Sequence, residues 1–264
     1  MRITIIGAGN MGSAIAKGLS RGKIVQAKDI TCTAKTQETL NKLRNFDSDF
    51  QLTTDNCTAV KDADLVILAV KPWIIKEVIS EIKPNLQLNK QSIVSIAAGI
   101  DFSTLEEWLT EDTGENISNL FRVIPNTAIE VKNSMTFISV HRPTLSAQET
   151  IVDLFEELGR VLIVEESKMA AYTALSSCGI AFALRYIRAS MEGGIELGIP
   201  AKQAKDIVAQ TVIGAAELLL QKQEHPEAEI DKVTTPGGIT IKGLNEMEQA
   251  GFTSAVIRGL KACE

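Results

Sequence analysis

The sequence contains few of the residues that hold metals or form disulfide frameworks. Its 264 residues include four cysteines and two histidines, and aromatic residues make up only 5%. The cysteines, at positions 32, 57, 178 and 263, show no Cys-x-x-Cys spacing, and neither histidine is placed beside them as a second ligand. This pattern argues against a structural zinc site and against disulfides. Free thiols are typical of the reducing cytoplasm, where we expect this protein to act.

Long apolar runs and an excess of positive charge are also missing. No segment has the roughly 18 consecutive apolar residues that a membrane span requires. The formal net charge is −6, and lysines and arginines are scattered among acids, which does not favour nucleic-acid binding. The amino-terminal apolar run is interrupted by glycines and Asn10, so a signal peptide is not expected. We therefore expect neither a nucleic-acid nor a membrane partner.

The first half of the chain alternates apolar β-type runs with helical patterns. Strands are predicted at 3–6, 30–33, 65–70, 92–96, 117–124, 135–140 and 161–164, and helices at about 37–44, 73–82 and 147–158. This alternation predicts an α/β fold with a parallel, doubly wound sheet. The last strands have fewer helices between them and are candidates for antiparallel edges.

The second half has no strand pattern. One long helix is predicted from 168 to 197, closed by Gly198 and Pro200, a second from 202 to 223, and two shorter ones on either side of Gly251. We place the boundary between a Rossmann domain (1–163) and a helical domain (164–264) near Val164. A helix of about 30 residues rises about 45 Å. So few remaining residues cannot cover it, which predicts a homodimer through this domain.

Gly7, Gly9 and Gly12 form a G-x-G-x-x-G pattern between the first strand and the first helix. In dinucleotide-binding proteins such glycines allow a tight turn, close approach of the pyrophosphate and tight packing of helix on strand. The free N–H groups of the helix start attract the phosphates. The alternative is a glycine-rich turn without a ligand.

The end of the second predicted strand indicates which dinucleotide binds. NAD-binding proteins usually carry an acid there, which contacts the ribose hydroxyls. Here Thr33, Lys35 and Thr36 occupy this position, and two hydroxyls with an ammonium suit a 2′-phosphate. NADPH is therefore favoured, with NADH as a possible cofactor. An ordinary helix start with a solvated lysine remains the alternative.

Small residues follow two later strands, in "AVKP" (69–72) and "AAG" (97–99). Ligands of open α/β sheets bind at this carboxyl edge, and small residues let a nicotinamide ribose approach the backbone. Lys71 is a candidate donor to a ribose, or else it only marks the end of a strand.

A second glycine-containing helix start lies in "TTPGGITIKG" (234–243). The N–H groups of Gly237, Gly238 and Ile239, together with the positive helix end, suit a carboxylate. The hydroxyl of Thr240, in the first helical turn, is a candidate proton donor. From these residues alone, a turn followed by a cap is the simpler interpretation.

The sequence resembles pyrroline-5-carboxylate reductase, the last enzyme of proline biosynthesis. Five segments carry the likeness, in order along nearly the whole chain: "IGAGNMGSAIAKGL", "AVKP", "SIAAGI", "RVIPNT" and "DKVTTPGGITIKGL". The resemblance implies a Rossmann domain followed by an all-helical dimerisation domain of the 6-phosphogluconate-dehydrogenase type. It also implies that NADPH reduces the cyclic imine 1-pyrroline-5-carboxylate to L-proline. The family often builds decamers of five dimers, with each active site between the Rossmann domain of one subunit and the helical domain of another.

The resemblance also implies roles for individual residues. The expected catalytic residue is Thr240, which matches a threonine that contacts the imine nitrogen. The expected substrate-binding residues are Thr235, Gly237, Gly238, Ile239, Asn126 and Glu165. The expected cofactor-binding residues are Ile6, Gly7, Ala8, Gly9, Asn10, Met11, Gly12, Thr33, Lys35, Thr36, Asn56, Ala69, Val70, Lys71, Pro72, Ala97, Ala98 and Gly99. Asn126 and Asn56 are equally suited to capping turns or helices, and first-turn glutamates such as Glu165 usually interact with the helix dipole.

The sequence departs from the family at the start of the long helix. The family usually reads close to "SGSGPAY", whereas this chain has "SSCGIAF" (176–182). Because Thr240 and its loop are intact, we favour a divergent member over a pocket reshaped for a related imine. A β-hydroxyacid or 6-phosphogluconate-like dehydrogenase is a further candidate, although this chain lacks the lysine motif of those enzymes. The non-enzymatic alternative is a paralogue that binds the nucleotide but catalyses no reaction.

Replacing Lys35 tests the choice of cofactor. We expect Lys35→Ala to raise the Michaelis constant for NADPH more than that for NADH, because only NADPH carries the 2′-phosphate that the ammonium would contact. Steady-state kinetics with both dinucleotides measure this. Equal effects on the two constants would refute the assignment.

Overall fold

The computed structural model describes residues 1–111 and 117–263. The chain divides into two compact units, Met1–Ser177 and Cys178–Glu264, each described here by itself. This division falls later in the chain than the boundary near Val164 that the sequence predicts. The residues between the two positions belong with the first unit because Met169 packs with Ile124 and Phe137 in a small apolar cluster.

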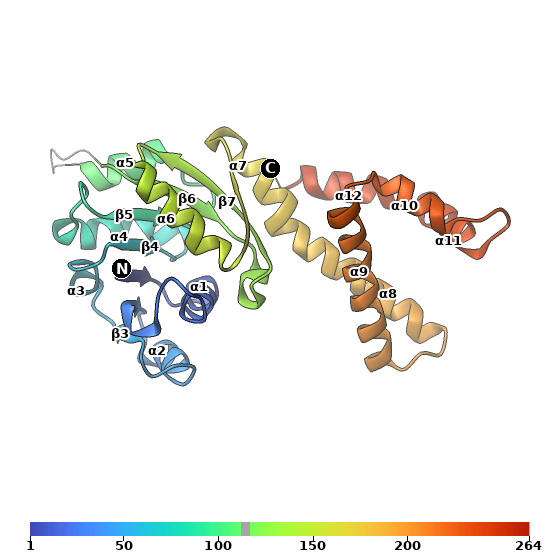
Figure 1. Ribbon diagram of the computed structural model, residues 1–264, viewed down its shortest axis with the longest axis horizontal. Helices are drawn as coiled ribbons and strands as arrows, with labels where there is room; N and C mark the ends of the chain where they lie inside the picture. The colour runs from blue at the N-terminus through green and yellow to red at the C-terminus, as the bar shows by residue number, and fades with distance from the viewer. Residues whose placement is uncertain (112–116, 264) are drawn as a thin grey trace. The chain divides into compact units, whose positions relative to one another are not determined.

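The first unit is built on one eight-stranded sheet in the order β3-β2-β1-β4-β5-β6-β7-β8 (Figure 1). The strands are β1 (Ile3–Ile6), β2 (Ile30–Thr33), β3 (Gln51–Thr53), β4 (Leu65–Leu68), β5 (Ser92–Ser95), β6 (Leu120–Ile124), β7 (Ser134–His141) and β8 (Gly159–Ile163). Every neighbouring pair is parallel except β6 and β7, so the expected antiparallel pairing occurs once. β1 lies between β2 and β4, where the strand order reverses and ligands of such sheets bind.

Helices cover both faces of this sheet. They are α1 (Asn10–Ser20), α2 (Gln37–Arg44), α3 (Asn56–Val60), α4 (Ile75–Ile82), α5 (Phe102–Thr110) and α6 (Leu145–Glu156). Side chains of α1, α2 and α6 pack with Ile3 and Ile5 in one core cluster, while those of α3, α4 and α5 pack with Ile6 in another. Burial on both faces explains why the central strands are apolar throughout rather than alternating.

Several short elements differ from the prediction. Two elements were not predicted from the sequence: β3, which is half-exposed, and α5, whose first turn is capped by the side chain of Asp101. The strand expected from 117 begins only at Leu120, because Asn119 has φ +62°, outside the extended region.

The long helix predicted from 168 to 197 is interrupted. α7 (Met169–Thr173) is followed by a π-helical turn, Ala174–Cys178, and then by α8 (Gly179–Glu196). Ser177 Oγ, inside the π turn, donates to the carbonyl oxygen of Pro125 at 3.1 Å. Single π turns often lie at functional sites, and this one coincides with the segment where the sequence departs from the reductase pattern.

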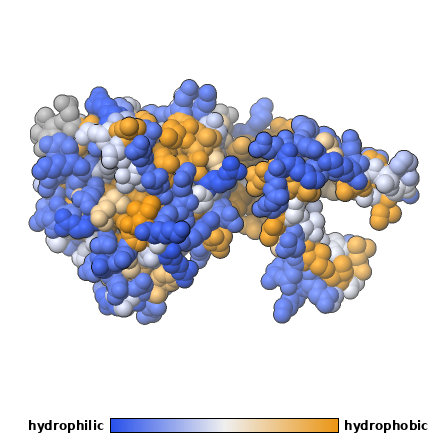
Figure 2. Space-filling view, viewed as in Figure 1, coloured by the Kyte–Doolittle hydropathy of each residue, from blue (hydrophilic) through white to orange (hydrophobic). Residues whose placement is uncertain are grey.

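The second unit consists of α8, α9 (Ala201–Lys222), α10 (Pro226–Val233), α11 (Ile239–Gln249) and α12 (Phe252–Lys261). Among its described residues only Ala204 is buried, and many large apolar side chains are exposed, such as Leu184 (58%) and Leu220 (55%). Figure 2 shows apolar surface on these helices. Apolar exposure on this scale indicates a protein interface. No helix in the described part of the chain is long and apolar enough to cross a membrane.

The exposed helices predict a stable dimer. We expect sedimentation equilibrium at micromolar concentration to give at least twice the chain mass, and Leu184→Asp to weaken the association. The matched control is Leu145→Asp, which adds the same charge at an exposed leucine of α6 in the first unit. A wild-type monomer at all concentrations would contradict the prediction.

Candidate active site

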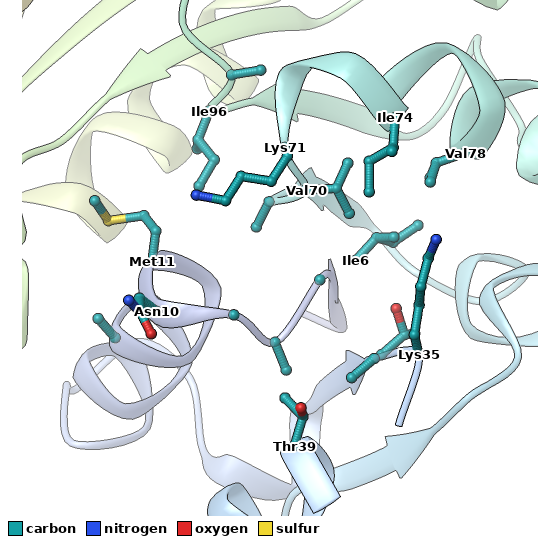
Figure 3. Close-up of a pocket in the computed structure, with 18 of the residues that line it drawn as sticks. Ile6, Asn10, Met11, Lys35, Thr39, Val70, Lys71, Ile74, Val78 and Ile96 are labelled. Carbon is teal, nitrogen blue, oxygen red and sulfur yellow. The ribbon is translucent and has the colours of Figure 1, made fainter. Parts of the chain in front are cut away.

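A cavity of about 920 Å³ lies at the carboxyl edge of the sheet. The ends of β1, β2, β4 and β5, the start of α1 and the 3₁₀ turn Thr127–Val131 form it (Figure 3). Most residues expected to bind the cofactor line it: Ile6, Gly7, Ala8, Gly9, Asn10, Met11, Thr33, Lys35, Asn56, Ala69, Val70, Lys71, Pro72, Ala97 and Ala98. The sheet topology thus gathers four separate sequence motifs at one place.

The glycine loop fits a phosphate-bearing ligand. Gly7 has φ +102°, which favours glycine, and a Cβ at Gly12 would lie 2.1 Å from the Gly7 carbonyl oxygen. Gly9 is the N-cap of α1 and offers no side chain to the first N–H groups of the helix. A Cβ at Gly9 would meet no protein atom within 4 Å, although Gly9 lines the cavity. The uncapped helix end and this open approach are what a pyrophosphate requires.

The β2 end of the cavity is formed by Thr33, Lys35, Thr39, Thr54 and Asn56. Thr33 Oγ1 donates to Asn56 Oδ1 at 2.6 Å, so the two residues form one hydrogen-bonded unit. Asp55, not Asn56, caps α3, because its side chain accepts from the N–H of Thr58. In Figure 3 Lys35 lies on the side of Val78, across the glycine loop from Met11.

Three residues expected at the cofactor do not line the cavity: Thr36, Gly12 and Gly99. Thr36 caps α2, because its Oγ1 accepts from the N–H of Thr39 at 3.4 Å. This favours the alternative of a helix start for Thr36, while Lys35 remains at the cavity. Gly12 serves packing against Gly7, and Gly99 has φ +80° in the turn before α5.

The opposite end contains Lys71, which Figure 3 places beside Ile96 and Met11. Thr127, Ile129 and Glu130 also line the cavity and were not found from the sequence. They belong to a 3₁₀ turn after β6 that packs on α1. No motif marks such residues, because the return of the chain from β6 to β7 brings them there.

Asn126 is held by the protein on both sides of its amide. It is 8% exposed, its Oδ1 accepts from the N–H of Ala128 at 3.0 Å, and its Nδ2 donates to Ser176 Oγ at 3.0 Å. Its capping role is therefore present, and it also fastens the π turn to the loop after β6. One N–H and one oxygen lone pair of the Asn126 side chain remain for a contact with substrate.

At the entrance of the long helix, Glu166 is the acid that contacts the sheet, and the expected role of Glu165 in substrate binding stays a prediction. The Glu165 side chain is exposed and pairs with Lys168 at 3.2 Å. Glu166 Oε1 accepts from Arg122 Nη1 and from the N–H of Phe102, both at 2.7 Å. Arg122 is buried on β6, and its Nε has no partner among the described atoms. This ion pair joins the helix entrance to β6 and to the first residue of α5.

The second glycine loop precedes α11 as expected, with one correction. Gly237 has φ +73°, and the N–H of Gly238 donates to the carbonyl oxygen of Thr235 at 2.9 Å, which closes a turn. The N–H of Gly238 is therefore not free for a carboxylate, unlike the prediction. Thr240 lies in the first turn of α11 and is exposed, as is Ile239.

Known protein families and known proteins match this chain along nearly its whole length. Residues 166–264 match the family described as pyrroline-5-carboxylate reductase dimerisation, and residues 2–99 match the family described as NADP oxidoreductase, coenzyme F420-dependent. Pyrroline-5-carboxylate reductase 1 of Dictyostelium discoideum is 37% identical over 98% of this chain, which spans about half (48%) of that protein. Pyrroline-5-carboxylate reductase 2 of the same organism is 36% identical over 98% of this chain and 89% of that protein. The chain belongs to the pyrroline-5-carboxylate reductase family.

A solved structure of this family shares the fold. The pyrroline carboxylate reductase of Plasmodium falciparum, solved with NADP bound, superposes with a TM-score of 0.89 at 24% identity, covering 100% of this chain and 95% of that one. The expected family and the expected pairing of a Rossmann domain with a helical dimerisation domain are confirmed. The helical unit lies within the match to the family's dimerisation domain, which supports the homodimer.

The altered segment contains one cysteine, Cys178. A hydrogen bond with Cys263, followed by burial, raises the pKa of the Cys178 thiol. Among the described residues no group of three or more His, Cys, Asp or Glu is placed to hold a metal ion.

Two glycine variants separate packing from binding. We expect Gly12→Ala to lower the melting temperature, because its Cβ would overlap the Gly7 carbonyl oxygen. Gly9→Ala meets no protein atom, so its cost should be at most that of a poorer N-cap, about 1 kcal/mol. It should nevertheless weaken NADP⁺ binding about tenfold, equivalent to about 1.4 kcal/mol. Thermal melts and calorimetric titration measure the two effects, and unchanged binding by Gly9→Ala would contradict the assignment.

Proposed function

We propose that this protein reduces 1-pyrroline-5-carboxylate to L-proline with NADPH. The observation that carries the proposal is the cavity of about 920 Å³ at the uncapped start of α1, in a chain of this reductase family. NADPH is favoured over NADH because Lys35, rather than an acid, follows β2 at the cavity. The family member from Plasmodium falciparum was also solved with NADP.

In this proposal the first unit binds and orients the dinucleotide. The N–H groups at the start of α1 hold the pyrophosphate, and the Lys35 ammonium faces the 2′-phosphate. Ala97 and Ala98 follow β5, and their small side chains leave room for the nicotinamide ribose. When bound, the reduced nicotinamide supplies the hydride that the imine carbon receives.

The start of α11 binds the substrate in this proposal. The positive end of the helix and the N–H groups of Ile239 and Thr240 attract the substrate carboxylate. The turn from Thr235 to Gly238 is closed by its own hydrogen bond, so it presents this helix start in a fixed conformation. The Thr240 hydroxyl holds a proton at the imine nitrogen, which makes the carbon a better acceptor of the hydride.

The family assignment does not by itself establish the size of the assembly or the location in the cell. Association of five dimers into a decamer is supported only by the resemblance, and a cytoplasmic location only by the unpaired cysteines. Both stay predictions.

One assay tests the activity. Purified protein is mixed with NADPH and 1-pyrroline-5-carboxylate, and the loss of NADPH absorbance is followed. The reverse reaction with 3-hydroxy acids and NADP⁺ is the comparison that a related dehydrogenase would catalyse. Turnover with the imine alone supports the proposal. Tight NADPH binding without turnover would instead indicate a nucleotide-binding paralogue.

Thr240→Ala tests the proton donor. We expect the turnover number to fall about tenfold to a hundredfold, the low end of proton-transfer contributions, with Thr240→Ser retaining most activity. Thr234→Ala is the control, because Thr234 ends α10 and its hydroxyl donates to the Ile230 carbonyl oxygen of that helix. Unchanged turnover in Thr240→Ala would remove this residue from the mechanism.

A further inference from the structure

A chain of two hydrogen bonds leads from the β2 end of the cavity to a carboxylate outside it. Thr33 Oγ1 donates to Asn56 Oδ1 at 2.6 Å, and Asn56 Nδ2 donates to Glu81 Oε2 at 3.0 Å. Thr33 and Asn56 line the cavity, whereas Glu81 does not. Glu81 is on α4, three residues after Val78, which also lines the cavity. Residues three apart share one helix face, so this face of α4 borders the β2 end.

The direction of both hydrogen bonds follows from the chemistry of the three side chains. An ionised carboxylate can only accept, so Asn56 must turn its amide nitrogen toward Glu81. The amide oxygen then faces Thr33, which must donate its single hydroxyl hydrogen. Thr33 therefore has only lone pairs left for a ligand, and Asn56 has one remaining N–H.

This arrangement changes what the β2 end offers to a nucleotide. A 2′-phosphate accepts hydrogen bonds and favours positive charge, whereas a ribose 2′-hydroxyl can also donate. The Thr33 hydroxyl can accept from a ribose but cannot donate to a phosphate, and Thr36 does not line the cavity. Lys35 remains the charged donor for a phosphate, and Glu81 adds a negative charge behind Asn56.

We propose that Glu81 is a positioning residue that sets cofactor specificity: by orienting Asn56 and by placing a negative charge behind it, Glu81 reduces the preference for a dinucleotide with a 2′-phosphate. The inference rests on the proposed function in one respect, that the cavity holds a dinucleotide. β2 lacks the acid that contacts the ribose in NAD-binding proteins. In this protein a carboxylate reaches the same end of the sheet from α4, through Asn56.

The test compares the affinities of NADP⁺ and NAD⁺ without any substrate. Isothermal titration calorimetry is carried out on the full chain and on Glu81→Gln, which keeps an acceptor for Asn56 and removes the charge. We expect the ratio of NADP⁺ to NAD⁺ affinity to rise about threefold to tenfold, the order expected for a solvent-screened charge. The rise should shrink in about 0.5 M salt, because the Debye length falls to a few ångströms.

The matched control is Glu77→Gln, which removes the same charge from an exposed position of the same helix. We expect Glu77→Gln to leave the ratio of the two affinities unchanged. A rise equal to that of Glu81→Gln would show that Asn56 plays no part.

Equal weakening of the binding of both dinucleotides by Glu81→Gln would indicate a purely structural role and overturn the inference. Suppose that the wild-type protein binds both dinucleotides and reduces the imine, but Glu81→Gln leaves the ratio of NADP⁺ to NAD⁺ affinity unchanged. Then only this inference is wrong. A wild-type protein that binds neither dinucleotide would overturn the proposed function and this inference with it.

Discussion

The close packing of α1 against the turn after β1 is the constraint on which the rest of the site depends. Gly12 leaves no room for a side chain beside the Gly7 carbonyl oxygen, so the helix begins directly at the carboxyl end of the central strand. Because Gly9 provides no side-chain cap, the first N–H groups of α1 remain directed at the cavity. The neighbouring strands β2 and β4 then determine what surrounds a ligand there, with Thr33 and Lys35 on one side and the residues after β4 on the other.

Polar contacts fasten the entrance of the helical region to the same sheet. Asn126 and Pro125, which follow β6, bind Ser176 and Ser177 of the π turn, and Glu166 binds Arg122 of β6. Burying the Arg122 charge costs desolvation energy, so the intact ion pair adds little net stability. Separating the pair would leave a buried charge without a partner, so the contact fixes the path of the chain. The segment in which this chain departs from the reductase pattern is thus anchored by its own serines. The altered residues still build an ordered connection to the loop after β6.

The helical unit presents an apolar surface that a second chain can cover. Its helices leave large apolar side chains exposed, and among its described residues only Ala204 is buried. Covering those side chains with a second chain removes apolar surface from water, at about 25 cal/mol per Å². The stability of such a unit depends on the concentration of the protein, because association and folding are linked.

The sequence by itself determined the family, the α/β class and the two glycine-bearing helix starts, because these depend on local patterns and on motifs of fixed spacing. It could not determine which groups hold one another across the fold. Three contacts show this: Glu166 binds Arg122, the Gly238 N–H donates within its own turn, and Thr36 caps α2. Each depends on where the partner atom lies in three dimensions. Glu81 gave no signal at all, since it reaches Asn56 only because α3 and α4 pack side by side on the sheet. Hydrogen bonds are short and directional, so residue types predict which groups can pair, and only the tertiary structure decides which ones do.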